Sequence, residues 1–282
     1  MHTLARFHFV FLAAFLVITR ADGEDPPNIF PALEQIKRED FQGALATLDE
    51  VIAWDDENDA AYALRARIYE RMERWEERLA DLDKVIQYRP NDPNTYNSRG
   101  TQRFRLGDAE GAAQDYDKAI SLDPRLEQRH WQRGLAYYYC DKYAEGAKQF
   151  ETYQTYDDSD VENVAWKFLC QAKVEGVTKA REGMMALGGV DRRQPMMQID
   201  ALYRGKGTVE QVFEEPAANQ RDENWEKYRK FYGHLYAGLY LDTVGDRDKA
   251  ERHILAADEL KNDHYMWYVA HLHANRIREA RE

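Results

Sequence analysis

The sequence predicts an all-α solenoid built from helix–turn–helix repeats. The chain of 282 residues repeats itself with a period of 34 residues through four consecutive blocks in unbroken register. It lacks the alternation of apolar and polar residues that half-buried strands show. Its 8 prolines and 16 glycines leave few positions where a helix must stop. These three observations indicate stacked helices with no sheet.

Residues 1–23 are predicted to be a secretory signal peptide. The run from Phe7 to Ile18 is nearly all apolar, but it is too short to cross a bilayer of ~30 Å as a helix. Small residues follow, and Ala21 and Gly23 fit a cut after Gly23. A cut after Ala21, or retention of the segment as an anchor, stays open. We expect an exported protein, periplasmic or secreted, and not lipid-anchored because no cysteine lies in this segment.

Four repeats are predicted over residues 24–160. Their blocks are 25–58, 59–92, 93–126 and 127–160. The eighth place of each block is small: Ala32, Ala66, Gly100 and Gly134. The twenty-fourth place is large and apolar, and it is expected to fill the space between repeats: Leu48, Leu82, Tyr116 and Phe150. A helix break is expected near each fifteenth place: Glu39, Glu73, Gly107 and Asp141. Arg78 stands where a small residue is usual, so the second repeat is expected to pack more loosely.

The rest of the chain is predicted to be helical but less regular. Residues 161–230 form an irregular helical segment, which Ser159 to Glu162 opens as a capping box. A fifth repeat follows at 231–264. Residues 265–282 are the expected closing helix, with one apolar side made by Met266, Val269, His273 and Ile277.

This pattern resembles the tetratricopeptide repeat, a helix–turn–helix unit of 34 residues. The third block carries the resemblance best, in the run RGTQRFRLGDAEGAAQDYDKAISLDP. The resemblance implies a right-handed superhelix with a concave face that binds other proteins. The order of four repeats, an irregular middle, a long helix, a last repeat and a closing helix resembles NlpI-type exported proteins of bacterial envelopes. That likeness implies an adaptor of envelope enzymes and leaves a homodimer open.

Composition and motifs argue against several other classes. The net charge of −12 disfavours nucleic-acid binding, because a phosphate backbone would be repelled. We expect no cofactor, since the sequence has no glycine-rich phosphate loop. No metal site is expected either, because no two histidines lie four residues apart on a helix. Whether Cys140 and Cys170 pair stays open. No catalytic residue is predicted.

Arginine and aspartate recur together in the repeats. Arg65, Arg99 and Arg133 occupy the seventh place, and Asp81 and Asp115 occupy the twenty-third. A basic ladder for a ligand is one interpretation. An ion pair inside each repeat is favoured, because the two partners recur together.

The first helices of stacked repeats line the concave face, and the resemblance assigns particular places to it. Arginines and amides at one end and aromatics at the other suit an extended peptide. The predicted protein-binding groove comprises Arg67, Arg71, Asn94, Asn97, Thr101, Arg105, Trp131, Leu135 and Tyr138. Alternatively, Trp131 and Tyr138 pack on a neighbouring helix.

We therefore expect a non-enzymatic adaptor or scaffold that binds other proteins or peptides in its groove. It is expected to bind no nucleic acid and to keep no membrane span after signal cleavage. One alternative is a structural subunit of a secretion or outer-membrane assembly complex. Another, from a different class, is a hydrolase with its site in 188–230.

Overall fold

The regular structure of this chain is helical throughout the part described. The computed structural model describes residues 26–214 and 223–281, and every regular element within them is a helix. The predicted all-α class is thus confirmed. The predicted signal peptide, residues 1–23, lies outside the described residues. The chain divides after Asp56 into two compact units.

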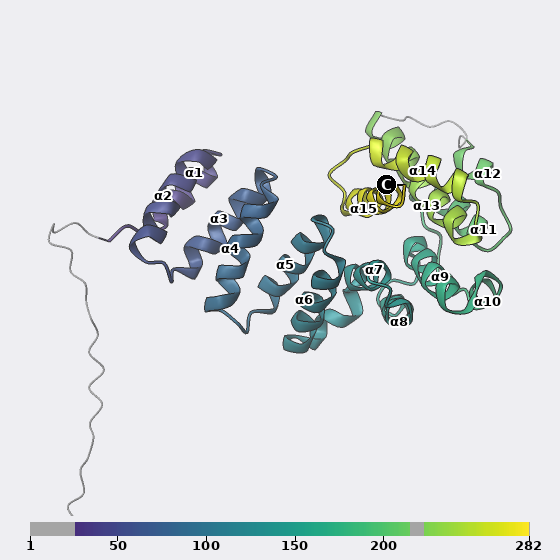
Figure 1. Ribbon diagram of the computed structural model, residues 1–282, viewed down its shortest axis with the longest axis horizontal. Helices are drawn as coiled ribbons and strands as arrows, with labels where there is room; N and C mark the ends of the chain where they lie inside the picture. The colour runs from purple at the N-terminus through teal and green to yellow at the C-terminus, as the bar shows by residue number, and fades with distance from the viewer. Residues whose placement is uncertain (1–25, 215–222, 282) are drawn as a thin grey trace, which may run out of the picture. The chain divides into compact units, whose positions relative to one another are not determined.

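The first unit contains one helix pair, α1 (Phe30–Lys37) and α2 (Phe41–Trp54) (Figure 1). Asp40 caps α2, since its carboxylate accepts a hydrogen bond from the Gly43 N–H at 2.9 Å. Ala32 on α1 and Ala44 and Leu48 on α2 are fully buried. The small residues of the eighth and twentieth places thus lie in the interior of this unit.

The second unit begins with three further helix pairs of the predicted repeats. A short 3₁₀ helix, η1, separates the last two pairs, so α7 begins four residues later than the block boundary suggests. The elements are α3 (Asp59–Arg71), α4 (Trp75–Tyr88), α5 (Pro93–Arg105), α6 (Ala109–Leu122), η1 (Pro124–Arg129), α7 (Trp131–Tyr139) and α8 (Tyr143–Gln154).

The remaining helices differ in length from one another. They are α9 (Val161–Glu175), α10 (Val177–Glu182), α11 (Met196–Tyr203), α12 (Val209–Phe213), α13 (Glu223–Val244), α14 (Arg247–Glu259) and α15 (Tyr265–Glu279). Helix α13 packs against α14 and α9. The interior around these helices is rich in aromatic side chains, among them Trp166, Tyr203 and Tyr236.

The turns inside the repeats lie where the period predicts them. Glu39, Glu73 and Asp141 have φ angles of 60°, 53° and 62°, and Gly107 has a φ of 89°. Gly245, at the same place in the fifth repeat, has a φ of 91°. A left-handed residue ends the first helix of each pair and reverses the chain. The predicted break at the fifteenth place is confirmed, although three of the five residues are not glycine.

Glycine at the eighth place permits close approach between the two helices of a repeat. A Cβ on Gly134 would lie 2.6 Å from the Phe150 ring, and one on Gly100 would lie 2.8 Å from the Tyr116 ring. The large residue of the twenty-fourth place therefore packs onto the eighth place of its own repeat. We expected it to fill the space between repeats, but the glycine leaves that room within the repeat.

Arg78 is buried despite its charge. Its guanidinium donates to Gln102 Oε1 at 2.7 Å and pairs with Glu70 at 3.1 Å. Burial lowers the pKa of Arg78. The arginine thus reaches the following repeat through a polar contact, where a small residue would have let the helices pack directly.

Candidate functional site

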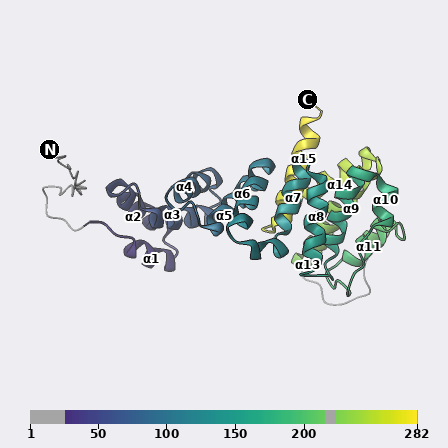
Figure 2. The same ribbon diagram turned by 90° about the horizontal axis from the view of Figure 1, so that it is seen from below.

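The closing helix α15 lies against the face of α5 and α7 that was predicted to be an open groove (Figures 1 and 2). Tyr265, its first residue, stacks on Phe104 with ring centroids 5.5 Å apart and meets Trp131 edge to face at 5.1 Å. His273 lies 3.2 Å from the Tyr139 hydroxyl. Of the predicted apolar side of this helix, Met266, Val269 and His273 are buried and Ile277 is half-buried. The chain therefore covers part of its own predicted binding face.

Two of the predicted groove residues belong to the core. Leu135 is fully buried and Tyr138 is 4% exposed. Tyr138 packs edge to face on Tyr143 and Trp166. An apolar pocket of Trp131, Leu135 and Tyr138 was expected. The correction is that the three do not share a pocket: Leu135 is in the core, Trp131 lines one cavity, and Tyr138 borders a different one together with Tyr143 and His273.

Three more predicted groove residues are engaged inside the fold. The Asn97 amide oxygen lies 2.8 Å from His130 Nε2, and the Thr101 hydroxyl donates to the Asn97 carbonyl. The Arg105 guanidinium lies over the rings of Trp75 and Tyr268, each 5.0 Å away. Arg105 is therefore held between two aromatic rings and is not the rim charge that the sequence suggested.

The other predicted residues remain accessible on α3 and α5. Arg67, Arg71 and Asn94 are exposed. Arg67 and Asn94 line a shallow hollow of about 200 Å³ together with Glu70 and Arg78. The structure thus brings Arg67 and Asn94 together, whereas Arg71 does not line this hollow. Whether a partner binds there stays a prediction.

A larger cavity of about 350 Å³ lies where α7, α8 and α9 meet α13 and the start of α15. Six aromatic side chains line it: Trp131, Phe150, Tyr153, Trp166, Tyr232 and Tyr265. Polar groups enter from the N-terminal end of α9, from the loop before α11 and from the α14–α15 turn: Asp160, Glu162, Asn163, Arg193, Asp263 and His264. We take this aromatic–acidic cavity as the candidate site.

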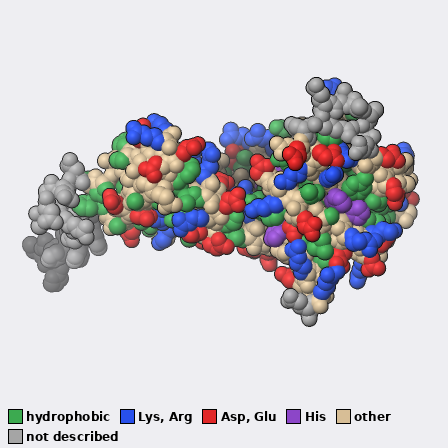
Figure 3. Space-filling view, turned by 90° about the horizontal axis from the view of Figure 1, so that it is seen from above, with side chains coloured by type: hydrophobic (Ala, Val, Ile, Leu, Met, Phe, Trp, Pro, Cys, Tyr) green, Lys and Arg blue, Asp and Glu red, His purple; other side chains and the backbone are tan. Residues whose placement is uncertain are grey.

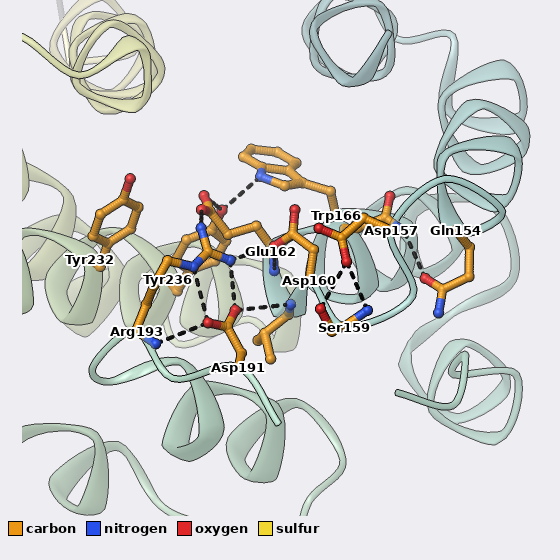
Figure 4. A network of polar contacts seen from close by, with 12 residues as sticks. Gln154, Asp157, Ser159, Asp160, Glu162, Trp166, Asp191, Arg193, Tyr232 and Tyr236 are labelled. Atoms are coloured by element: carbon orange, nitrogen blue, oxygen red, sulfur yellow. Dashed lines mark hydrogen bonds and ion pairs between the residues drawn. The ribbon is translucent and has the colours of Figure 1, made fainter. Parts of the chain in front are cut away.

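Arg193 is the centre of the polar network at this cavity (Figure 4). Its guanidinium contacts carboxylate oxygens of Asp160, Glu162 and Asp191, each at 2.6 Å. The Tyr236 hydroxyl donates to the other oxygen of Glu162 at 2.6 Å and accepts from the Trp166 indole N–H at 3.0 Å. These contacts hold the Glu162 carboxylate in one orientation.

The acid groups of this network outnumber its cation. Burial and the negative charge of Asp160 raise the pKa of Glu162 to about 7. Burial also raises the pKa of Asp160, against the attraction of Arg193. The cavity therefore has a negative character that Arg193 offsets only in part.

The sequence predicted a different role for residues 159–162, which lie at this cavity. Ser159 to Glu162 was expected to form a capping box. Instead Asp160 caps α9, accepting from the Glu162 N–H at 3.0 Å, while the Glu162 side chain contacts Arg193 and Tyr236. The box is absent because Arg193 and Tyr236 engage that carboxylate. A cluster of charges at 191–193 within an irregular segment was the available signal for Arg193.

The recurring arginines pair within their repeats, as favoured from the sequence. Arg65 contacts Asp81 at 2.7 Å and Arg99 contacts Asp115 at 2.6 Å. In the fourth repeat Arg133 donates to Gln149 at 2.7 Å. On the face drawn in Figure 3, basic and acidic side chains are interspersed. These arginines therefore stabilise the repeats and do not form a free basic ladder.

Cysteines and histidines are the remaining candidates for chemistry. Both cysteine thiols are free. The structure brings His234 and His253 together, with Nδ1 atoms 3.0 Å apart, although they are 19 residues apart in the sequence. Within residues 26–214 and 223–281, no three His, Cys, Asp or Glu side chains are grouped closely enough to hold a metal ion. Within the same ranges, no helix has the length and apolar character that a membrane span requires.

Comparison with known proteins identifies the repeat. A family model described as tetratricopeptide repeat matches residues 64–131. The chain therefore contains tetratricopeptide repeats. No curated protein sequence matches it. The likeness in layout to NlpI-type proteins stays a prediction.

One solved structure, that of MamA, supports the same fold. The crystal structure of MamA is similar over 67% of this chain and 94% of that chain, with a TM-score of 0.50 and 14% identity. PilW, a type IV pilus biogenesis factor, is 12% identical over 82% of this chain and 90% of its own, with a TM-score of 0.46. Pseudomonas aeruginosa pilF is 14% identical over 90% and 96%, with a TM-score of 0.44. At these identities the likeness to MamA is evidence for the repeat fold alone.

Proposed function

We propose that this chain is a non-catalytic adaptor that binds segments of partner proteins, with the aromatic–acidic cavity as its anchoring site. The observation that carries the proposal is the cavity itself: six aromatic side chains and a fixed polar network line a volume of about 350 Å³. Aromatic pockets of this kind bind the few partner side chains that dominate interface energy. The accessible hollow at Arg67 and Asn94 offers a second, polar contact for the same partner segment.

The hydrolase alternative has less support. In the described part of 188–230, the carboxylate of Asp191 contacts Arg193 and that of Asp200 pairs with Arg204. Both carboxylates are engaged in ion pairs, so neither is placed as a free general base. Export is part of the proposal, on the strength of the apolar run in residues 1–23. Terminal sequencing of the native protein should then begin near Asp22 or Glu24.

The test is a pull-down from an envelope extract of the source organism, followed by mass spectrometry. Wild-type protein is compared with Trp131→Ala, which removes a half-buried wall of the cavity. The matched control is Phe30→Ala, because Phe30 is 71% exposed and lies outside the cavity. Loss of partners with Trp131→Ala but not with Phe30→Ala supports the proposal, and we expect an affinity loss of about 2 kcal/mol or more.

Urea unfolding of the same variants separates binding from folding. A folded Trp131→Ala protein that keeps all its partners would remove the cavity from the proposal. Several partners at low stoichiometry are expected of an adaptor. A single fixed complex would instead favour the structural subunit of a secretion or outer-membrane assembly machine.

A further inference from the structure

The charges that line the aromatic–acidic cavity select the kind of group that fits it. Asp160, Glu162 and Asp263 supply carboxylates, and Arg193 is the one arginine or lysine among the described lining residues. The Arg193 guanidinium is already in contact with Asp160, Glu162 and Asp191. An anion entering the cavity would meet excess negative charge and a cation that is already paired. A positively charged group would instead be attracted by the excess of carboxylates.

Hydrogen-bond acceptors at the cavity have unused capacity. Among the described residues, the Glu162 N–H and the Arg193 guanidinium both donate to the same carboxylate oxygen of Asp160, its Oδ1. The other oxygen, Oδ2, accepts no hydrogen bond from these residues. Asn163, which is 3% exposed and lines the cavity, has an amide oxygen without a donor among the described residues. A ligand that donates N–H groups would satisfy atoms that an apolar side chain would leave unpaired.

The walls suit the apolar stem of such a ligand and the charge that it carries. Trp131 and Tyr265 meet edge to face at 5.1 Å and line the same cavity. Trp166 stacks on Phe150 with ring centroids 6.4 Å apart, so its ring is held in place. Aromatic faces attract ammonium and guanidinium groups, and the attraction strengthens where water is excluded. A volume of about 350 Å³ has room for one long side chain.

We propose that the aromatic–acidic cavity binds a lysine or arginine side chain of the partner protein, with Asp160 as the main acceptor and Trp131 and Tyr265 as aromatic walls. This inference rests on the proposed function, because it assumes that the cavity is a docking site. It adds the chemical class of the anchor residue.

The test uses four matched peptides of the form acetyl-Ala-X-Ala-amide, in which X is lysine, arginine, norleucine or glutamate. Norleucine has nearly the length of lysine without its charge. Binding to the full chain is followed by NMR through the indole N–H signals of Trp131 and Trp166, assigned with the Trp131→Phe and Trp166→Phe proteins. We expect the lysine and arginine peptides to bind about tenfold more tightly than the norleucine peptide.

Asp160→Asn is the decisive variant. Asparagine is as good an N-cap as aspartate, so α9 should keep its cap. We expect this variant to weaken binding of the lysine peptide about tenfold and to leave the norleucine peptide unchanged. Asp158→Asn removes the same charge two residues away, outside the cavity lining, and should have little effect.

Each result separates the two proposals. If norleucine binds as tightly as lysine, and Asp160→Asn changes nothing, the cationic anchor is overturned while the cavity remains a docking site. Tightest binding by the glutamate peptide would also overturn the cationic anchor. If none of the peptides moves the indole signals up to millimolar concentration, the cavity is not a docking site, and the proposed function loses its anchor as well.

Discussion

Glu162 is a carboxyl group held away from water between a guanidinium and a tyrosine hydroxyl. Its pKa is raised to about 7 because burial and the charge of Asp160 outweigh the attraction of Arg193. Below its unfolded pKa, both the folded and the unfolded chain hold the proton. Between that value and about 7, only the folded chain does. The contribution of Glu162 to the free energy of unfolding is therefore largest in acid and is lost as the pH rises toward 7.

Glu162→Gln should abolish this pH dependence. Relative to wild type, the variant's free energy of unfolding should rise by about 2–3 kcal/mol between pH 4.5 and 7.5. Urea unfolding over that range measures the difference. The control is Glu175→Gln, which removes an exposed carboxylate from the other end of α9. Equal pH profiles for Glu162→Gln and wild type would contradict the raised pKa.

Each helix pair depends on contacts repeated within the 34-residue unit. The small eighth place lies under the large twenty-fourth place, and a left-handed residue reverses the chain between the helices. Glycine occupies that left-handed position in only two of the five repeats. A residue with a Cβ is strained in the left-handed conformation. Replacing it by glycine should therefore stabilise the repeat.

Gly134→Ala should destabilise the fourth repeat. The added Cβ would lie 2.6 Å from the Phe150 ring, and both helices would have to move apart. We expect a loss of about 1–3 kcal/mol in the free energy of unfolding. Gly183→Ala is the control, since its Cβ would meet its nearest neighbour at an ordinary 3.5 Å. A loss of equal size in both variants would show that the close approach at Gly134 is not the cause.

Glu39→Gly should stabilise the first helix pair. Glu39 has a φ of 60°, which glycine adopts without the clash of a Cβ. We expect a gain of about 1 kcal/mol in the free energy of unfolding of residues 26–56. The neighbouring Arg38 has a φ of −91°, so Arg38→Gly should bring no gain. Hydrogen exchange of the α2 amides measures both, and a gain from Arg38→Gly alone would contradict the argument.

At the scale of the whole molecule, several histidines are buried as neutral side chains. Burial is the main reason that the pKa values of His130, His234 and His273 are each lowered to about 4. The Nδ1 of His130 accepts a hydrogen bond from the Arg133 backbone N–H. His273 on α15 contacts the hydroxyl of Tyr139 on α7. Folding therefore excludes protons that the unfolded chain would bind below pH 6.5. The stability from these groups is present above that value and is lost as the pH falls toward 4.

Acid should therefore weaken the fold before most carboxylates are protonated. We expect His130 alone to account for a loss of about 2–3 kcal/mol between pH 6.5 and 4. His130→Asn keeps an N-cap acceptor and removes the titration, so its free energy of unfolding should fall less over that range. Chemical unfolding at several pH values tests this. Parallel profiles for the variant and wild type would rule out His130 as a source.

The sequence by itself determined what recurs every 34 residues: the helix pairs, the turn at Glu73 or Gly107, and the pairing of Arg99 with Asp115. These features join residues about 16 positions apart on two antiparallel helices, so one repeat contains all the information needed. Only the tertiary structure decided the candidate site. Arg193 reaches Asp160 from 33 residues away, and Tyr265 reaches Trp131 from the closing helix. Residues 161–230, which supply Arg193, do not follow the 34-residue period. The packing of α15 over α5 and α7 covers part of the predicted groove and leaves the cavity beside it. The shape of that cavity depends on how large aromatic side chains from distant helices pack, which no local sequence pattern specifies.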